Sequence, residues 1–226
     1  MGQRCFQIGA IGDTLHMSII RYSLGEMDNN TYLIVDEATK EGALVDPSFE
    51  SDTLLPDILG RVSSLKYVLN THAHFDHVIG NAFFVEKTGA LLALHRLDLP
   101  LLRMLPEQGR MFGYEIEASP EPTIFLEEGQ PIQLGETTIQ VLFTPGHAPG
   151  HVSFLVGEDL LSGDCLFYGS IGRTDLPGAS LQTLLHSISS RLMTLPDNTR
   201  VLSGHGAEST IGRERKSNPY LKDIKI

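Results

Sequence analysis

Four side chains that can bind a metal lie within six consecutive positions of the stretch Thr71-His-Ala-His-Phe-Asp-His77, namely His72, His74, Asp76 and His77. Imidazole and carboxylate groups are ligands for zinc, iron and manganese, and they seldom gather this densely merely to fill a core. The apolar run at residues 66–70 is typical of a short buried strand. We therefore expect a metal site in the loop at the carboxyl end of that strand.

Three further ligand candidates, His147, Asp164 and His205, each follow an expected strand and each have a neighbouring glycine. Glycine lets the backbone turn sharply at a strand end, so several loops can point at one place above the sheets. Taken alone, His147 or His205 would be read as an ordinary polar residue rather than as a ligand. Together with the first cluster, all three predict one shared site.

The elements expected to position these loops alternate between strands and helices. The strands are predicted at residues 16–24, 31–35, 42–45, 66–70, 91–94, 137–143, 151–156, 160–162 and 200–203, with 31–35 and 42–45 forming a hairpin. The helices are predicted at residues 51–59, 78–87, 97–105 and 181–195, with Ser51 and Ser180 as N-caps and Gly60 and Gly89 as stops. Residues 111–122 and 169–180 read as long loops near a site.

Each half of the chain thus has strands followed by helices, which predicts an α/β fold with two mixed sheets packed together and helices outside, a four-layer αβ/βα sandwich. The length of 226 residues and the hydrophobic content of 41% fit one domain spanning residues 1–226.

Charge and cysteine content exclude several classes of function. The net charge of −11 argues against nucleic acid or an anionic membrane as partner, because phosphate binding needs clustered Lys and Arg. Cys5 and Cys165 cannot form a disulfide framework, and we interpret Cys165 as a small core residue rather than a nucleophile. The N-terminus shows no apolar signal-peptide core. These features predict a cytoplasmic protein.

The pattern His72-x-His74-x-Asp76-His77, followed by His147, Asp164 and His205, resembles the metallo-β-lactamase fold superfamily of binuclear hydrolases. The stretches 110–113, 145–151, 172–175 and 203–206, with 213–221, further resemble the short bacterial type II glyoxalases (hydroxyacylglutathione hydrolases). The similarity runs from about residue 31 to the C-terminus, and the first 30 residues carry no usable motif. The longer type II glyoxalases add a helical substrate-binding domain after the last ligand, and only residues 206–226 remain here.

The resemblance implies two divalent ions, with zinc expected and iron or manganese also compatible with the ligands. It assigns His72, His74 and His147 to one ion, Asp76, His77 and His205 to the other, and Asp164 to a bridge between them. Asp76 and Asp164 are the residues expected to act in catalysis. Such sites leave room for a hydroxide and a substrate, as a catalytic metal site requires.

The resemblance also implies a small-molecule thioester substrate, S-lactoylglutathione or a related hydroxyacylglutathione. Its thiolate needs little protonation on leaving, since an ordinary thiol has a pKa of about 8.5. Arg173 is the cation expected to bind a substrate carboxylate. His151 is expected to hydrogen-bond a ligand or its loop, whereas His16, His95 and His186 read as structural.

Other functions stay open on the sequence alone. A mononuclear-iron glutathione persulfide dioxygenase would use only His72, His147 and Asp164, and a lactonase or β-lactamase would use a similar centre. A purely structural metal conflicts with seven ligand-type residues, because structural zinc is normally saturated by four. The metal, the acyl group and the oligomeric state are not determined by the sequence.

Overall fold

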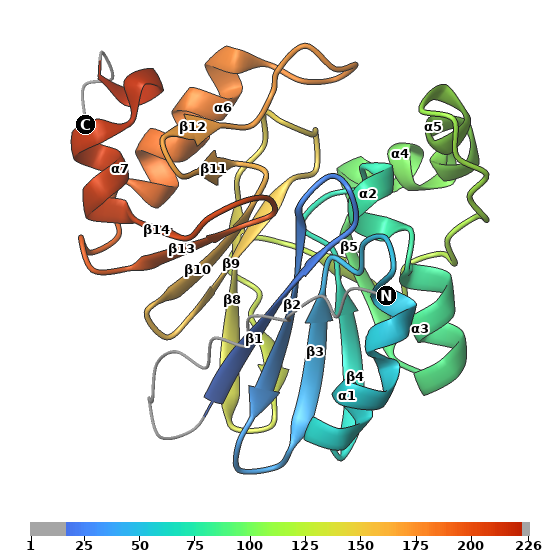
Figure 1. Cartoon of the computed structure of the whole chain (residues 1–226). Coiled ribbons are helices and arrows are strands. Elements are labelled where there is room, and N and C mark those ends of the chain that lie inside the picture. Colours follow the sequence, from blue (N-terminus) through green and yellow to red (C-terminus); the bar gives the residue numbers. More distant parts are fainter. Residues whose placement is uncertain (1–16, 223–226) are drawn as a thin grey trace, which may run out of the picture.

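The computed structural model describes residues 17–222, in which two six-stranded sheets pack against each other with helices on their outer sides (Figure 1). The first sheet consists of β1 (Met17–Leu24), β2 (Asn29–Asp36), β3 (Glu41–Val45), β4 (Ser64–Leu69), β5 (Leu91–His95) and β6 (Ile124–Leu126), in that order. Strands β1 to β3 are antiparallel neighbours, and β3 to β6 are parallel. The predicted hairpin is confirmed as β2 and β3, which pair with Tyr32 opposite Val45.

The second sheet has the order β14-β13-β10-β9-β8-β7. Its strands are β7 (Ile132–Leu134), β8 (Thr137–Phe143), β9 (Val152–Val156), β10 (Asp159–Gly163), β13 (Arg200–Ser203) and β14 (Ser209–Thr210). Only β10 and β13 are parallel neighbours in this sheet, and the other pairs are antiparallel. A separate small hairpin joins β11 (Leu166–Phe167) to β12 (Ser170–Ile171).

The helices cover the outer face of each sheet: α1 and α3 lie over the first, and α6 and α7 over the second (Figure 1). The α-helices are α1 (Leu55–Arg61), α2 (Phe75–Val78), α3 (Asn81–Thr88), α4 (Leu99–Arg103), α5 (Leu105–Met111), α6 (Leu181–Ser187) and α7 (Ile211–Ser217). Shorter turns are the 3₁₀ helices η1 (Ser51–Leu54), η2 (Arg96–Asp98) and η4 (Pro219–Leu221), and the π-helical η3 (Ile188–Leu192). Within residues 17–222, no helix has the length and apolar content needed to cross a membrane.

Three apolar layers hold the sandwich together. The central layer joins the two sheets, with Ile34 and Leu69 of the first packed with Phe154 and Leu202 of the second. One outer layer joins the first sheet to α1 and α3, and another joins the second sheet to α6 and α7. The four-layer αβ/βα prediction is therefore confirmed, and the assignment of residues 1–226 to one domain stays a prediction.

Several predicted helix boundaries are wrong. Ser51 does not cap a helix: residues 51–54 form η1, whose N-cap Glu50 makes no side-chain cap bond. Gly60 does not stop α1, which runs to Arg61 and ends where Val62 becomes extended. The α-helix begins at residue 55 because a proline in its first turn suits that position.

The other predicted helices also differ from the observed ones in where they begin and end. The predicted helix 78–87 is divided into α2 and α3, and Gly89 closes α3 in the left-handed conformation, as expected. The predicted helix 97–105 is replaced by η2, α4 and α5, which extends to Met111. Ser180 caps α6 by accepting a bond from the Thr183 amide, as predicted, but α6 gives way to the π-helical η3. The predictions did not include β6, β7, the small hairpin or α7.

Candidate metal centre

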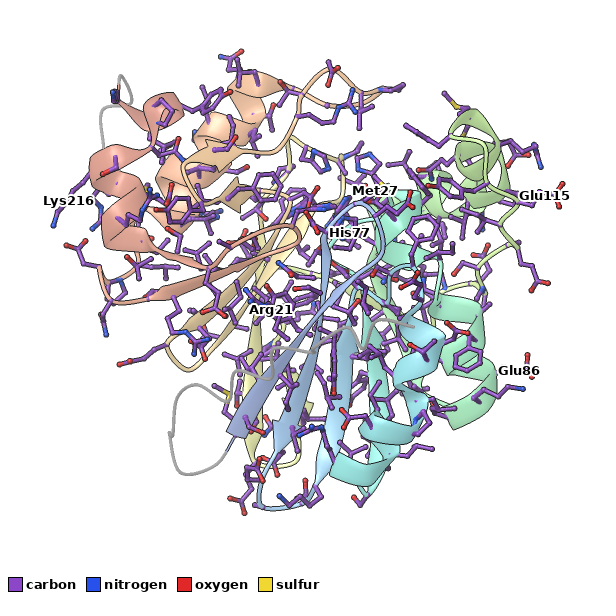
Figure 2. All side chains as sticks on the ribbon, viewed as in Figure 1. Arg21, Met27, His77, Glu86, Glu115 and Lys216 are labelled. Atoms are coloured by element: carbon purple, nitrogen blue, oxygen red, sulfur yellow. The ribbon has the colours of Figure 1, made fainter. Side chains whose placement is uncertain are left out.

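Loops from both sheets bring the seven predicted ligands together at one edge of the sandwich, between the two halves of the molecule (Figure 1). Residues 72–77 follow β4, and His147 lies in the loop between β8 and β9. Asp164 follows β10, and His205 follows β13. In Figure 2, His77 lies at the centre of this edge near Met27 of the β1–β2 turn.

The first group of candidate ligands consists of His72, His74 and His147. One nitrogen from each ring lies within 4.8 Å of the others, and His74 Nδ1 is 2.9 Å from His147 Nε2. His72 and His147 are buried. Three imidazole nitrogens converging on one point match the three protein ligands of a catalytic tetrahedral metal site.

The second group consists of Asp76, His77 and His205, whose ligand atoms also lie within 4.8 Å of one another. The Nε2 atoms of His77 and His205 are 3.2 Å apart, and Asp76 Oδ2 is 3.5 Å and 3.3 Å from them, respectively. The His205 side chain keeps 24% of its surface exposed. The centre is therefore in contact with solvent on the His205 side.

Asp164 lies between the two groups. Its Oδ2 is 3.5 Å from Nε2 of both His147 and His205, and its Oδ1 is 3.4 Å from Nε2 of His77. One carboxylate is thus within reach of ligands from both groups, which is the position of a bridging ligand.

Hydrogen bonds on the outer side of the rings fix which nitrogen faces the centre. The Nδ1–H groups of His147 and His205 can donate to the carbonyls of Arg173 and Met27, at 2.9 Å and 2.8 Å. His77 Nδ1 lies 3.1 Å from an Asp46 carboxylate oxygen. A ring that donates through one nitrogen leaves the other unprotonated as a metal ligand. All three rings therefore direct Nε2 toward the centre.

Two buried polar atoms at the centre fit a metal because they have no hydrogen-bond partner: His72 Nε2 and Asp164 Oδ1. Burial lowers the pKa of His72 well below 6.5, that of His74 to about 3, and that of His147 below its ordinary value. These rings are thus neutral, as ligation requires. Burial would lower the pKa of His77, but the Asp164 and Asp76 carboxylates raise it well above 6.5. Burial likewise opposes ionisation of Asp164, but the positive charge of His77 outweighs it and keeps the pKa of this carboxyl low.

The predicted role of glycine beside the ligands is visible at two positions. Gly163 has a φ of +50°, and a Cβ there would lie 2.6 Å from Thr71 Oγ1. A Cβ at Gly204 would lie 2.3 Å from Asp164 Oδ1. The β10–β13 pairing also shifts register between Leu161 and Gly163, and such bulges re-aim the next side chains. Side chains at either glycine would displace the loops that hold Asp164.

A model of the Metallo-beta-lactamase superfamily matches residues 24–205, which include all seven side chains of the centre. The chain belongs to the metallo-beta-lactamase superfamily. Hydroxyacylglutathione hydrolase GloC of Haemophilus influenzae is 38% identical over 200 residues, covering 85% of this chain and 92% of that protein. The resemblance seen in the sequence is therefore confirmed at the level of the superfamily, and the chain is a metallo-hydrolase of it.

Two solved structures agree with the fold. The BLEG-1 B3 metallo-beta-lactamase has a TM-score of 0.84 at 33% identity, covering 90% of this chain and 99% of that one. TTHA1623 in a di-iron-bound form has a TM-score of 0.81 at 41% identity, covering 89% and 99%. A similar protein thus holds two iron ions, so the choice between zinc and iron stays open for this chain.

Asp46 is a buried residue of this metallo-beta-lactamase superfamily chain that the sequence analysis missed. It follows β3 with a φ of +49°, and it accepts bonds from the Thr71 amide and hydroxyl at 2.8 Å and 2.6 Å. Its Oδ2 is also the partner of His77 Nδ1. The sequence signal for Asp46 is its place directly after an apolar strand, β3. That strand lies next to β4, which precedes residues 72–77.

His151 lies next to the candidate ligands, with its ring centroid 5.1 Å from that of His72. Its Nε2 accepts a 3.1 Å bond from the Asp164 amide, and its Nδ1 is 2.9 Å from the Thr144 hydroxyl. The ring is fully buried, and burial lowers its pKa well below 6.5. A neutral His151 is therefore placed to position the Asp164 backbone, in keeping with its predicted role next to a ligand.

The structure places the remaining candidates outside the group of ligands. The Arg173 guanidinium binds Asp175 through bonds of 2.7 Å and 2.8 Å and is 56% exposed. Cys165 is buried and packs with Leu160 and Leu184 in the outer apolar layer, which confirms its structural interpretation. His95 stacks on Phe143, and His186 is exposed on α6. Cys5 and His16 lie outside the described residues.

The start of β2 contributes to the centre although the first 30 residues carry no recognisable motif. The Asn29 side-chain amide donates to Asp76 Oδ2 at 3.0 Å. The Asn30 amide donates to the Gly204 carbonyl at 2.7 Å, and its side chain donates to the Ser203 and Gly206 carbonyls at 2.9 Å each. The start of β2 therefore holds the loop that carries His205.

Proposed function

We propose that this chain is a two-ion hydrolase of thioesters, with S-lactoylglutathione or a related hydroxyacylglutathione as substrate. The observation that carries the proposal is the position of Asp164 between two complete groups of ligand-type side chains. The 38% identity with a protein named hydroxyacylglutathione hydrolase supports the substrate class. The cytoplasmic location stays a prediction.

The first ion would be held by His72, His74 and His147. The second would be held by Asp76, His77 and His205, with Asp164 shared by both ions. Zinc is the proposed metal, and the same donors also suit iron and manganese. When bound, the two ions supply a hydroxide nucleophile at neutral pH and polarise the carbonyl under attack.

The residues of the chain supply position and charge. Asp76 and Asp164 bring two carboxylates that offset the charge of the ions, and the outward hydrogen bonds of His77, His147 and His205 hold each ring in one orientation. The exposed side of His205 is the proposed entry for substrate. A thiolate leaving group suits this centre because it departs without a strong general acid.

The second group of ligands argues against the persulfide dioxygenase, which would need only His72, His147 and Asp164. Asp76, His77 and His205 converge as closely as the first group does, and nothing in a mononuclear centre requires that convergence. A β-lactamase activity is the second alternative, because BLEG-1 has the same fold at 33% identity.

The deciding experiment measures metal content and three activities on one purified sample. We expect about two ions per chain together with hydrolysis of S-lactoylglutathione, and little turnover of a β-lactam. Oxygen consumption with glutathione persulfide, without thioester cleavage and with one iron per chain, would assign the dioxygenase instead.

A further inference from the structure

Asp98 is a buried carboxylate that joins two loops of the metal centre without contacting a ligand side chain. It is 0% exposed, and among residues 17–222 it takes part in no ion pair. Its Oδ2 accepts a 3.0 Å bond from the Ala73 amide, and its Oδ1 accepts a 2.5 Å bond from the Gly150 amide. A buried carboxylate is costly unless it is well hydrogen-bonded, and these two backbone amides supply its hydrogen bonds.

The two amides belong to the loops that carry the first group of ligands. Ala73 lies between His72 and His74, and Gly150 lies three residues after His147. The first loop follows β4 of one sheet, and the second joins β8 to β9 of the other sheet. Asp98 therefore fastens the His72–His74 pair to the loop of His147 across the boundary between the sheets.

The absence of a side chain at Gly150 lets Asp98 approach its backbone amide closely. A Cβ at Gly150 would lie 2.6 Å from the Asp98 backbone nitrogen and 2.9 Å from its Cγ. These distances are shorter than ordinary van der Waals contacts, so any side chain at position 150 would push Asp98 away from the loop. A second bond, from the Val152 amide to the Thr71 carbonyl at 2.8 Å, joins the same loops nearby.

The second group of ligands is fastened by different residues. Asn30 binds the carbonyls of residues 203, 204 and 206 around His205, and Asn29 binds Asp76. Neither asparagine has a hydrogen bond with Asp98, and the bonds of Asp98 reach neither Asp76 nor the 203–206 loop. Asp46 joins Thr71, next to His72, to His77 and so touches both groups, but the bonds of Asp98 and those of the two asparagines support different ligands.

We propose that Asp98 is a positioning residue specific to the first ion, and that Asn30 has the corresponding part for the second. The inference rests on the two-ion centre of the proposed function. Its consequence is that the affinities for the two ions can be changed one at a time by residues that bind no metal.

The test uses two backgrounds that each keep one group of ligands intact. In His205→Ala only the first group is complete, and in His147→Ala only the second is complete. Asp98→Asn is added to each background, because an amide of the same shape places an N–H₂ group against one of the two backbone N–H donors. The affinity of the metal-free protein for Zn²⁺ is then measured by titration against a competing chelator.

We expect Asp98→Asn to weaken Zn²⁺ binding about ten- to a hundred-fold in the His205→Ala chain, the range typical for residues behind a metal ligand. In the His147→Ala chain its effect should be less than about three-fold on the same scale. Asn30→Ala should show the reverse pattern. It should weaken Zn²⁺ binding in the His147→Ala chain and have little effect in the His205→Ala chain. Equal losses in both backgrounds, or no loss in either, would overturn the inference.

Gly150→Ala disturbs the same hydrogen bond at its donor and should change Zn²⁺ affinity in the same way as Asp98→Asn. The inference can therefore be tested even if one of the two variants folds poorly. The Tm of each metal-free variant reports on folding independently of metal. A chain that binds two ions without cleaving thioesters would refute the proposed substrate and leave this inference intact. If the unsubstituted chain binds one ion, the proposed function fails, and the His205→Ala comparison still decides the role of Asp98.

Discussion

His77 places its Nδ1 3.1 Å from Oδ2 of Asp46, on the side of the ring opposite the Nε2 that faces the other ligands. Both side chains are almost fully buried. The Thr71 amide and hydroxyl donate to the same carboxylate, so Asp46 ties the start of the first ligand loop to the end of it. A carboxylate in this position fixes the orientation of a ligating imidazole.

Replacing Asp46 should therefore weaken binding of the ion held through His77. We expect Asp46→Ala to lower Zn²⁺ affinity about ten- to a hundred-fold, and Asp46→Asn to lower it less, because the amide oxygen still accepts one bond. Chelator competition on metal-free protein measures the change. The control is Asp52→Asn, an exposed carboxylate of η1. Unchanged affinity in Asp46→Ala would show that Thr71 and the backbone suffice to hold His77.

Asp164→Asn should cost more activity than any change outside the seven ligands, because a neutral amide offsets the charge of the ions poorly. We expect kcat to fall at least about a hundred-fold, equivalent to about 2.7 kcal/mol of barrier. Metal content is measured in the same sample. The control is Glu86→Gln, an exposed residue of α3 at the periphery of the molecule (Figure 2). Near-normal turnover with two ions bound would reject the bridging role.

Arg173 and Asp175 give a pair of variants with opposite expected effects. If Arg173 binds a substrate carboxylate, it must give up part of its bidentate bond to Asp175. Arg173→Ala should raise KM for an acyl-glutathione about three- to ten-fold, since exposed charge pairs contribute little. Asp175→Ala should lower that KM, because it frees the guanidinium.

Neither Arg173→Ala nor Asp175→Ala should change kcat/KM for an uncharged thioester. The backbone carbonyl of residue 173, which accepts from His147 Nδ1 at 2.9 Å, is retained in the alanine variant. An equal loss on charged and uncharged substrates would mean that the side chain supports the His147 loop instead of binding substrate.

Asp36 should make stability depend on pH far from the metal centre. Burial alone would raise its pKa, but hydrogen bonds from Thr39, Glu136 and Thr137 outweigh burial and lower the pKa from 3.8 to about 2. Because the folded-state pKa is depressed, ionised Asp36 stabilises the fold above about pH 4. That contribution, about 2 kcal/mol, is lost as the pH falls from about 4 to about 2.

Asp36→Asn should thus lower the free energy of unfolding by about 2 kcal/mol at pH 7 and by much less near pH 2. Urea unfolding of metal-free protein between these values measures the difference without interference from acid release of metal. Asp52→Asn again serves as control. A deficit that stays constant down to pH 2 would assign the effect to packing rather than to the charge.

The sequence by itself was sufficient to name the seven side chains that converge at the centre. Local spacing determined His72 to His77, and a glycine next to each of the other three marked sharp turns at strand ends. The layers were equally predictable, because an apolar strand such as residues 66–70 needs cover on both faces and an alternating strand such as residues 137–143 needs cover on one. Helix ends were less predictable, since Ser51 and Gly60 carried the usual signals without forming the expected cap and stop.

Only the tertiary structure decided which residues support the ligands. Asp46, Asn29 and Asp98 lie far from their partners in sequence. Asp46 has one local signal, its place directly after an apolar strand, and no local pattern distinguishes the other two from ordinary polar residues. Their roles arise when strands pair and the two sheets pack: Asp46 and Asn29 meet residues of a loop in the same sheet, and Asp98 meets Gly150 of the other sheet. A buried polar group must find a partner inside the fold, and that partner is set by strand pairing and sheet packing rather than by neighbours along the chain.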